Sequence, residues 1–327
     1  MKILHICAGW QKWNGAANIA RMIMDEQRRE GHEVSFATWA KLRELRAADE
    51  VWIHCGWLPC LWWAALWGRN VHWMPEACYD PVRLRFHGWK KWLVGPIERW
   101  CLRRCDRIVA TCEAEKGWIE KYLGKKCPAV EVADIKRFFD FSRVERVEGE
   151  EGSRKERKER KDDRRVEERG LDGRVEHVER AEGGEGSRVD RVENGEVHLL
   201  YLGRRHPLKG VEYLEEAIKS LPSVSSVYSV VQKPELRIVS SAFGEELEKV
   251  WDWCDVLVLP TLSDNFGLVV AEALERGKRV ITTDGAPAWG DGNDYGGRLI
   301  YLKGYRDGTE EYRIRVLKDA VGAQIGV

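Results

Sequence analysis

The segment that decides the fold class of this chain is residues 254–287, CDVLVLPTLSDNFGLVVAEALERGKRVITTDGAP. The apolar run Val256–Leu259 predicts a buried strand, and a loop, a helix over about 266–276 and a second apolar strand at Val280–Thr282 follow it. The order strand, helix, strand is typical of a parallel sheet with helices on its faces. A helix that begins near the end of such a strand presents free N–H groups, and these favour an anion.

The same alternation of strand and helix extends over most of the chain. Residues 1–142 contain candidate strands at 2–7, 34–38, 51–54, 71–73, 107–111 and 129–132, with helices near 16–30, 58–68, 88–104 and 113–123. Residues 197–327 repeat the pattern, and 327 residues are enough for two domains. We therefore expect an α/β fold of two tandem Rossmann-like domains, each a doubly wound parallel sheet, that face a cleft.

Residues 143–196 differ in composition from both predicted domains. More than half of them are charged, the two signs nearly balance, and no aromatic residue occurs among them. Such a segment cannot bury enough apolar surface to offset the loss of chain entropy on folding. We predict a low-complexity, disordered insertion between the domains; a specific electrostatic partner is the alternative.

Composition narrows the classes of function. The formal net charge is zero, so no overall field favours nucleic acid as a partner. The nine Cys show no zinc or redox spacing and indicate small buried hydrophobes in a reducing cytoplasm. The apolar run Trp57–Trp67 is about half as long as a membrane span, and the chain starts directly with a strand at Lys2. We expect a cytoplasmic protein.

Two cations follow the first strand of the second domain. The strand is expected to end at Gly203, Arg204 comes next, and a helix begins just after Lys209. Positive charges at the mouth of a parallel sheet suit a diphosphate.

Two carboxylates, Asp264 and Glu272, lie at the start of the helix predicted over 266–276 and within it. Eight helical residues span about 12 Å, which is too far for two acids that act on one bond. The pair is better suited to contact two ends of one elongated ligand.

These two segments resemble the donor site of GT-B glycosyltransferases of the family 4 type. In that family a Gly-Arg…Lys-Gly segment holds the leaving nucleotide diphosphate, which here gives Arg204 and Lys209 this role. The family also has Glu, seven residues and Glu with Phe-Gly inside, where the first carboxylate contacts the donor sugar and the second the ribose. Asp264 replaces the first Glu with a side chain that is shorter by one methylene, and Glu272 matches the second.

The resemblance also gives binding roles to backbone groups. The N–H groups of Asn265, Phe266 and Gly267 are expected to face the diphosphate. Near the start of the chain, Gly15 begins the first helix where the family has a Gly-Gly pair, and Asn14 replaces the first of these glycines. Gly15 still allows the backbone to approach a ligand closely.

The implied reaction is a retaining transfer of a sugar from a nucleotide-sugar donor to an acceptor hydroxyl, in the synthesis of lipopolysaccharide or another surface glycan. Arg204, Lys209 and Asp264 are its expected catalytic residues, and the acceptor is expected to be a glycan or glycolipid. No cofactor is expected, and two cations replace a divalent metal ion. A GT-B nucleotide-sugar epimerase and a non-catalytic sugar-nucleotide-binding protein are the alternatives, because Asp264 and Asn14 depart from the family pattern.

Three features of the first domain have two interpretations each. Glu76, Tyr79 and Asp80 follow the fourth strand and either meet the acceptor or form a structural loop. Glu113 and Glu115 resemble a family motif, and we favour helix capping. The stretch 83–107 interleaves eight cations with three Trp; it predicts contact with an anionic membrane surface, on the inner face of the cell membrane, or a core helix with a solvated face.

Deletion of residues 146–194 and closure with a short flexible linker is expected to leave folding and donor binding intact. The segment has no core-forming residues, and closing a long loop costs little free energy. Thermal unfolding and ligand titration of the shortened chain check this. A shortened chain that fails to fold would show that the segment packs against the domains.

Overall fold

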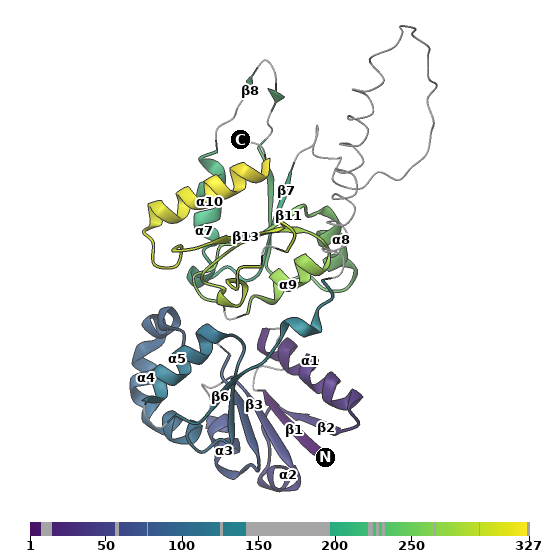
Figure 1. Cartoon of the computed structure of the whole chain (residues 1–327), viewed down its shortest axis with the longest axis vertical. Helices are drawn as coiled ribbons and strands as arrows, with labels where there is room; N and C mark the ends of the chain where they lie inside the picture. The colour runs from purple at the N-terminus through teal and green to yellow at the C-terminus, as the bar shows by residue number, and fades with distance from the viewer. Residues whose placement is uncertain are drawn as a thin grey trace, which may run out of the picture.

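Apolar runs such as Val256–Leu259 form the centres of two parallel sheets in the computed structural model (Figure 1). The structure describes residues 1–7, 15–55, 59–76, 78–124, 127–141, 197–221, 225–226, 229–230, 233–264, 266–293 and 295–325. The predictions for Asn14, for Asn265 and for the whole of 143–196 lie outside these residues.

The N-terminal domain is a parallel sheet in the order β2-β1-β3-β4-β5-β6 with helices on its faces. Its strands are β1 (Lys2–Cys7), β2 (Glu33–Ala37), β3 (Glu50–His54), β4 (Val71–Met74), β5 (Arg107–Ala110) and β6 (Val130–Val132). Its helices are α1 (Gly15–Arg29), α2 (Leu42–Ala47), α3 (Pro59–Trp67), α4 (Pro81–Leu102) and α5 (Glu113–Leu123), followed by the 3-10 turn η2 (Lys136–Phe138).

The C-terminal domain repeats this architecture with a parallel sheet in the order β10-β7-β11-β12-β13. Its strands are β7 (His198–Leu202), β10 (Glu235–Val239), β11 (Val256–Leu259), β12 (Arg279–Thr283) and β13 (Leu299–Leu302), with a small antiparallel pair, β8 (Ser225–Ser226) and β9 (Ser229–Val230). Its helices are α7 (Val211–Lys219), α8 (Glu245–Trp253), α9 (Leu268–Glu275) and α10 (Glu310–Ile325), with 3-10 turns η4 (Pro207–Lys209) and η5 (Pro287–Trp289). The predicted fold class is confirmed.

Helix boundaries differ most from the sequence prediction where capping decides them. Helix α4 begins at Pro81, seven residues before the predicted start near 88, because the carboxylate of Asp80 accepts a hydrogen bond from the N–H of Val82 (2.8 Å) and Pro81 favours the first helical position. Glu115 reaches back to the N–H and hydroxyl of Thr111 at 2.8 and 3.0 Å, as the capping interpretation predicted. Helices α2, α8 and α10 were not predicted; α10 packs along α7.

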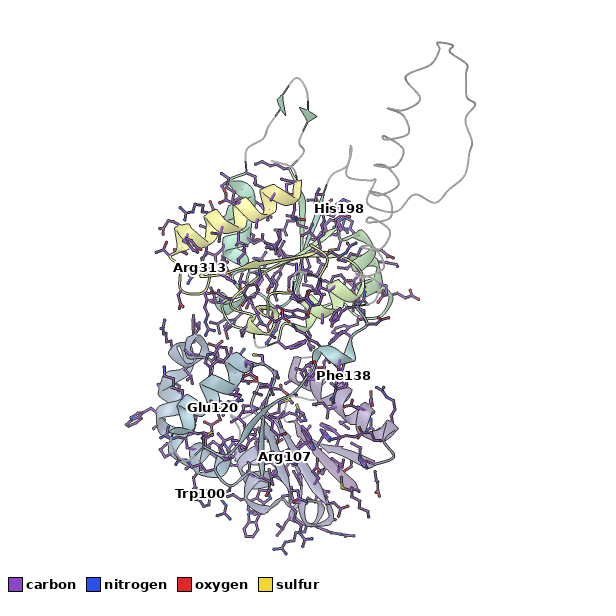
Figure 2. The ribbon with its side chains drawn as sticks, viewed as in Figure 1. Trp100, Arg107, Glu120, Phe138, His198 and Arg313 are labelled. Atoms are coloured by element: carbon purple, nitrogen blue, oxygen red, sulfur yellow. The ribbon has the colours of Figure 1, made fainter. Side chains whose placement is uncertain are left out.

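The carboxyl edges of the two sheets face each other across the domain boundary (Figure 1). Ser263, after β11, donates a hydrogen bond to Asp80, after β4, at 2.5 Å. The segment after β6 crosses to the second domain, where Phe139 stacks on Phe266 and Lys136 pairs with Asp291 at 2.6 Å. Figure 2 places the neighbouring Phe138 at this junction. The chain therefore brings the loops of both sheets to one interdomain region, where α/β folds bind ligands.

Among the described residues, no helix is long and apolar enough to cross a membrane. Six of the described cysteines, at positions 7, 78, 101, 105, 112 and 254, are buried. They pack as small apolar side chains, as expected from their spacing.

Candidate functional site

The candidate site lies where the order of the C-terminal sheet changes direction. Strands β7 and β11 are neighbours, but the chain leaves β7 towards β10 on one side and leaves β11 towards β12 on the other. The loops that follow such strands diverge and leave room for a ligand between them. Arg204 and Lys209 lie in the first loop, and Asp264 lies in the second.

The two loops are tied together through one carbonyl group. The carbonyl oxygen of Leu208 accepts hydrogen bonds from the N–H of Leu262 (2.8 Å) and the hydroxyl of Thr261 (3.0 Å). Gly210 permits this approach: its φ is +63°, and a Cβ at this position would lie 2.2 Å from the carbonyl oxygen of Pro260. Because backbone contacts fix both loops, the cations and the carboxylate have a defined separation.

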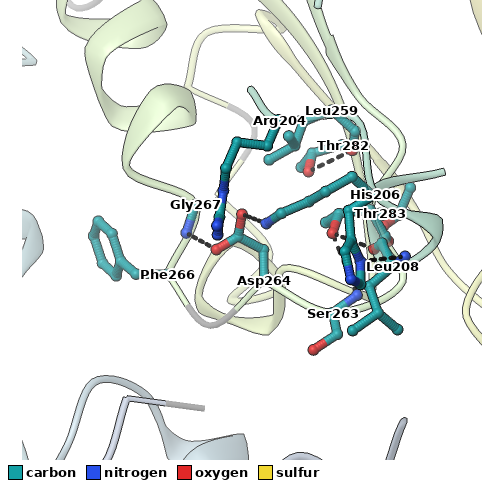
Figure 3. Close-up of polar contacts among 12 residues, drawn as sticks. Arg204, His206, Leu208, Leu259, Ser263, Asp264, Phe266, Gly267, Thr282 and Thr283 are labelled. Atoms are coloured by element: carbon teal, nitrogen blue, oxygen red, sulfur yellow. Dashed lines mark hydrogen bonds and ion pairs between the residues drawn. The ribbon is translucent and has the colours of Figure 1, made fainter. Parts of the chain in front are cut away.

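Lys209 and Asp264 form an ion pair between these loops (Figure 3). The other carboxylate oxygen of Asp264 accepts a hydrogen bond from the N–H of Gly267 at 3.3 Å. Burial by itself would raise the pKa of Asp264, but the charge and hydrogen bond of Lys209, with smaller contributions from Arg83 and the Gly267 N–H, lower it below its ordinary value. Asp264 is therefore an anion at neutral pH. An ammonium group has three N–H bonds, so Lys209 keeps donors for a ligand.

Arg204 is exposed at the mouth of the same loop. The hydroxyl of Tyr201 donates a hydrogen bond to the backbone carbonyl of Arg204 at 2.9 Å, which fixes the backbone and leaves the side chain to solvent. In Figure 3 the guanidinium group points toward the Asp264 carboxylate and the start of α9. The neighbouring Arg205 instead pairs with both carboxylate oxygens of Glu215, at 2.7 and 3.1 Å.

The first residues of α9 present backbone groups to the site. The N-cap residue is Gly267, in a left-handed conformation with φ +69°, and it provides no side-chain cap for the helix N–H groups. Phe266 is 2% exposed and packs on Phe139 and Trp289, so its side chain anchors the loop while its backbone borders the site. Gly15 lies opposite: a Cβ there would be 3.8 Å from Cδ1 of Leu268. The starts of α1 and α9 thus meet across the domain boundary.

Glu272 lies further along α9, more than one helical turn after Gly267. Its burial raises the pKa of its carboxyl group, with further upward contributions from Glu275 and Glu248, while Arg276 acts in the opposite direction. No hydrogen bond to this carboxylate occurs among the residues that the structure describes. Glu272 is therefore a largely buried carboxyl group on α9 whose electrostatic neighbours are Arg276, Glu275 and Glu248.

A second constellation, which the sequence pattern did not reveal, joins the two domains beside Asp264. Asp80 is fully buried; it accepts hydrogen bonds from Ser263 and from the guanidinium group of Arg306. Arg306 also lies 5.0 Å from the ring centroid of Trp118. Only the Asp80-Pro81 pair, a typical helix start, was visible in the sequence.

The loop after β4 therefore has mainly structural contacts. Tyr79 is 1% exposed and stacks on Tyr122, with ring centroids 4.4 Å apart, and Asp80 holds the domains together. For Tyr79 and Asp80, these contacts agree with the interpretation of the segment as a structural loop. Arg83 in the first turn of α4 exerts a favourable charge effect on both Asp264 and Glu76, and it adds a cation from the N-terminal domain.

A buried chain of polar side chains runs behind this edge of the N-terminal sheet. The amide oxygen of Gln27 lies 2.7 Å from Nε2 of His5, Nδ1 of His5 lies 3.0 Å from Nε2 of His54, and Nδ1 of His54 lies 3.1 Å from the carboxyl group of Glu76. The thiol of Cys55 approaches the second oxygen of Glu76 at 3.7 Å.

The donors and acceptors of this chain determine its protonation. Gln27 accepts from Nε2 of His5, so Nδ1 of a neutral His5 must accept from Nε2 of His54. Nδ1 of a neutral His54 then needs a donor, and among the described residues its partner is Glu76, which can donate only when protonated. Burial lowers the pKa of His5 and of His54 to about 3 and raises the pKa of Glu76 to about 8, in agreement with a neutral chain.

Two family models match the chain, one in each domain. Residues 36–133 match the model described as a glycosyl transferase 4-like domain, and residues 196–305 match the model described as glycosyl transferases group 1. A comparison with curated protein sequences found no match.

Solved structures show the same two-domain arrangement. HepE from Anabaena, crystallised in complex with UDP, is 12% identical with a TM-score of 0.56, and the match covers 99% of this chain and 91% of HepE. The sucrose-phosphate synthase of Thermosynechococcus elongatus is 12% identical with a TM-score of 0.58, over 100% and 97%. WaaG, a glycosyltransferase of lipopolysaccharide biosynthesis, is 11% identical with a TM-score of 0.58, over 99% and 91%. At these identities the likeness establishes the fold.

Glu76→Gln is expected to make the protein more stable than the wild type as pH rises from 4.5 to 8. In the wild type the folded chain keeps a proton on Glu76 that the unfolded chain releases above pH 4.5, so its stability falls until the pKa of about 8 is passed. The amide of Gln can donate to His54 without titrating. The difference should grow by up to about 1.4 kcal/mol per pH unit.

Denaturant unfolding of both proteins at pH 4, 6 and 8 checks this expectation. Glu120→Gln, at an exposed position of α5, is the matched control and should follow the wild type. Parallel stability curves for wild type and Glu76→Gln would contradict a protonated Glu76.

Proposed function

This chain belongs to the glycosyltransferases of the GT-B fold, and on that premise we propose that it transfers a sugar from a nucleotide-sugar donor to an acceptor hydroxyl with retention of anomeric configuration. The observation that carries the proposal is the convergence of Arg204, the Lys209–Asp264 ion pair and the start of α9 at the interdomain edge of the second sheet. Two cations and a helix N-terminus together suit the diphosphate of such a donor.

The proposed chemistry breaks the bond between the sugar C1 and the diphosphate oxygen and forms a bond from C1 to the acceptor oxygen. Negative charge grows on the leaving diphosphate, and Arg204 and Lys209 neutralise it. The acceptor proton passes to an oxygen of the donor phosphate. Arg204 and Lys209 supply the charge that a divalent metal ion would otherwise provide, so the proposal includes no metal ion or cofactor.

We assign roles to the two carboxylates of the site from their positions relative to α9. Asp264 lies before the helix and holds Lys209, so we assign it to the hydroxyls of the donor sugar. Glu272 lies on the helix itself, and we assign it to the ribose of the nucleotide. Gly15 approaches the first residue of α9 from the other domain, which suits a backbone that closes over the donor.

More specifically, we propose a hexosyltransferase that acts in the cytoplasm on a lipopolysaccharide or another surface glycan. The lack of zinc or redox spacing among the nine cysteines of the sequence agrees with a reducing compartment. The glycan role is supported by the resemblance of the donor motifs and by the fold shared with WaaG. The acceptor is then a glycan or glycolipid.

Thermal shift with UDP-, GDP- and ADP-sugars tests the proposal, since a donor at about 100 times its dissociation constant adds about 2.7 kcal/mol of stability. The donor that binds is then incubated with and without extracts of surface glycan. Consumption that requires the acceptor supports the transferase. Consumption without it indicates an epimerase, and binding without consumption under either condition indicates a non-catalytic protein.

Arg204→Ala and Lys209→Ala are each expected to lower turnover at least about a hundredfold, because each removes charge stabilisation equivalent to about 2.7 kcal/mol from the leaving diphosphate. Arg205→Ala is the matched control, since Arg205 is engaged by Glu215. Near-normal rates for both Arg204→Ala and Lys209→Ala, in folded protein, would refute the donor-site assignment.

Glu272→Gln is expected to weaken binding of the nucleoside diphosphate itself, whereas Asp264→Asn is expected to affect sugar choice and turnover. Calorimetry with the nucleoside diphosphate alone separates the two roles. Glu248→Gln, an exposed carboxylate that pairs with Arg276 at 2.9 Å, is the control for a charge change near α9. If only Asp264→Asn loses binding, the two assignments are reversed.

A further inference from the structure

One face of α4 exposes large apolar side chains to solvent. The exposed fractions are 50% for Phe86, 66% for Trp89, 80% for Trp92, 57% for Leu93, 52% for Ile97 and 51% for Trp100. These positions follow each other at helical spacing and form one continuous side of the helix, about 21 Å long from Phe86 to Trp100. Soluble proteins rarely expose so much contiguous apolar surface without a binding role.

The fold itself does not require this face. The opposite side of α4 supplies the buried contacts of the helix, with Gly95, Glu98, Cys101 and Leu102 turned into the N-terminal domain. Asp80 caps the start of the helix. The helix is thus fixed from one side and from its N-terminus, while its tryptophans point outward; Figure 2 places Trp100 at the outer rim of the domain.

Positive charge surrounds the exposed apolar face. Arg85 is exposed in the first half of α4, and Arg103 and Arg104 are exposed immediately after its end. The guanidinium group of Arg104 lies 5.1 Å from the ring centroid of Trp100. The only carboxylate in the sequence of α4 is Glu98, which is buried and accepts a hydrogen bond from Tyr122 at 3.1 Å.

We propose that this face of α4 binds the surface of a lipid bilayer that contains anionic lipids. We call it the α4 surface and define it as Arg85, Phe86, Trp89, Trp92, Leu93, Ile97, Trp100, Arg103 and Arg104. A helix with tryptophan on its outer side and arginine around it lies parallel to the bilayer, with the rings at the headgroup level and the cations on anionic headgroups.

Charge favours a bilayer over a second copy of this chain. A symmetric pair would place the α4 surface of one copy against the same surface of the other, so cations would meet cations. The α4 surface has no exposed carboxylate to balance them. An anionic bilayer meets both the apolar and the basic parts of the surface at once.

A bilayer bound to the α4 surface would lie close to the candidate site. The residue that caps α4 is Asp80, and Asp80 contacts Ser263, the residue before Asp264. A bilayer held along α4 would therefore lie beside the entrance between the domains. A membrane-linked acceptor for the proposed transferase would be presented at that entrance; this last step rests on the proposed function, whereas bilayer binding does not.

Sedimentation of the full-length protein with vesicles tests the proposal without any sugar donor. Vesicles contain phosphatidylcholine alone or with 30% phosphatidylglycerol, at low and high salt. The wild type is expected to bind the anionic vesicles at low salt and to release as salt increases. Trp92→Ser/Leu93→Ser/Ile97→Ser and Arg85→Glu/Arg104→Glu are each expected to weaken binding tenfold or more.

Two controls match these changes in chemistry. Trp39 is 58% exposed and follows edge strand β2, away from α4 in Figure 1, so Trp39→Ser should bind like the wild type. Arg28→Glu/Arg43→Glu produces the same change in net charge elsewhere on the domain and should have little effect. The changed positions are solvent-exposed, so thermal unfolding of every variant should match that of the wild type.

Three results would overturn the proposal. They are no binding to anionic vesicles at low salt, equal binding by the serine variant, and an equal loss of binding in the controls. A wild-type dimer that the serine variant converts to monomers, with no vesicle binding by either, would assign the α4 surface to subunit contact. Turnover of the soluble substrates is measured separately, so failure of the reaction assignment would leave the vesicle result unchanged.

Discussion

The arrangement of the two domains depends on one buried carboxylate. Asp80 has no exposed surface, and a charge in such a place requires partners because desolvation is costly. It accepts from the N–H of Val82, which fixes the start of α4, and from Ser263 and Arg306, which belong to the other domain. One side chain therefore determines where α4 begins and holds the loop before Asp264 against the N-terminal sheet. The α4 surface and the candidate site are fixed relative to each other by this contact.

The candidate site in turn combines the Lys209–Asp264 ion pair with a backbone that is held in place. Leu208 and Gly210 hold the loop of Lys209 against the loop of Asp264, and Phe266 is packed into the interior behind the start of α9. A site built in this way does not have to reorganise when charge develops on a leaving group, which is the condition for strong electrostatic stabilisation. The ion pair holds the ammonium group of Lys209 against the carboxylate of Asp264.

The N-terminal edge of the same region has the opposite electrostatic character. His5, His54 and Glu76 are buried and linked by hydrogen bonds that are all satisfied when the three groups are neutral. A neutral chain avoids the cost of buried charge while keeping a polar network beneath the loops. The region between the domains thus has cations on the C-terminal side and neutral polar side chains on the N-terminal side. The charge of Arg83 acts to lower the pKa of both Glu76 and Asp264.

The sequence by itself determined the α/β class, the two sheets and the loops that carry Arg204, Lys209, Asp264 and Glu272, because strand burial and helix periodicity are local properties. It did not determine which side of α4 is buried, the pairing of Asp80 with Arg306, or the chain from Gln27 to Glu76. These features join residues up to 226 positions apart in the chain. Only the packing of strands and helices brings such groups together, and that same packing decides which tryptophans of α4 reach solvent and which polar groups must remain neutral.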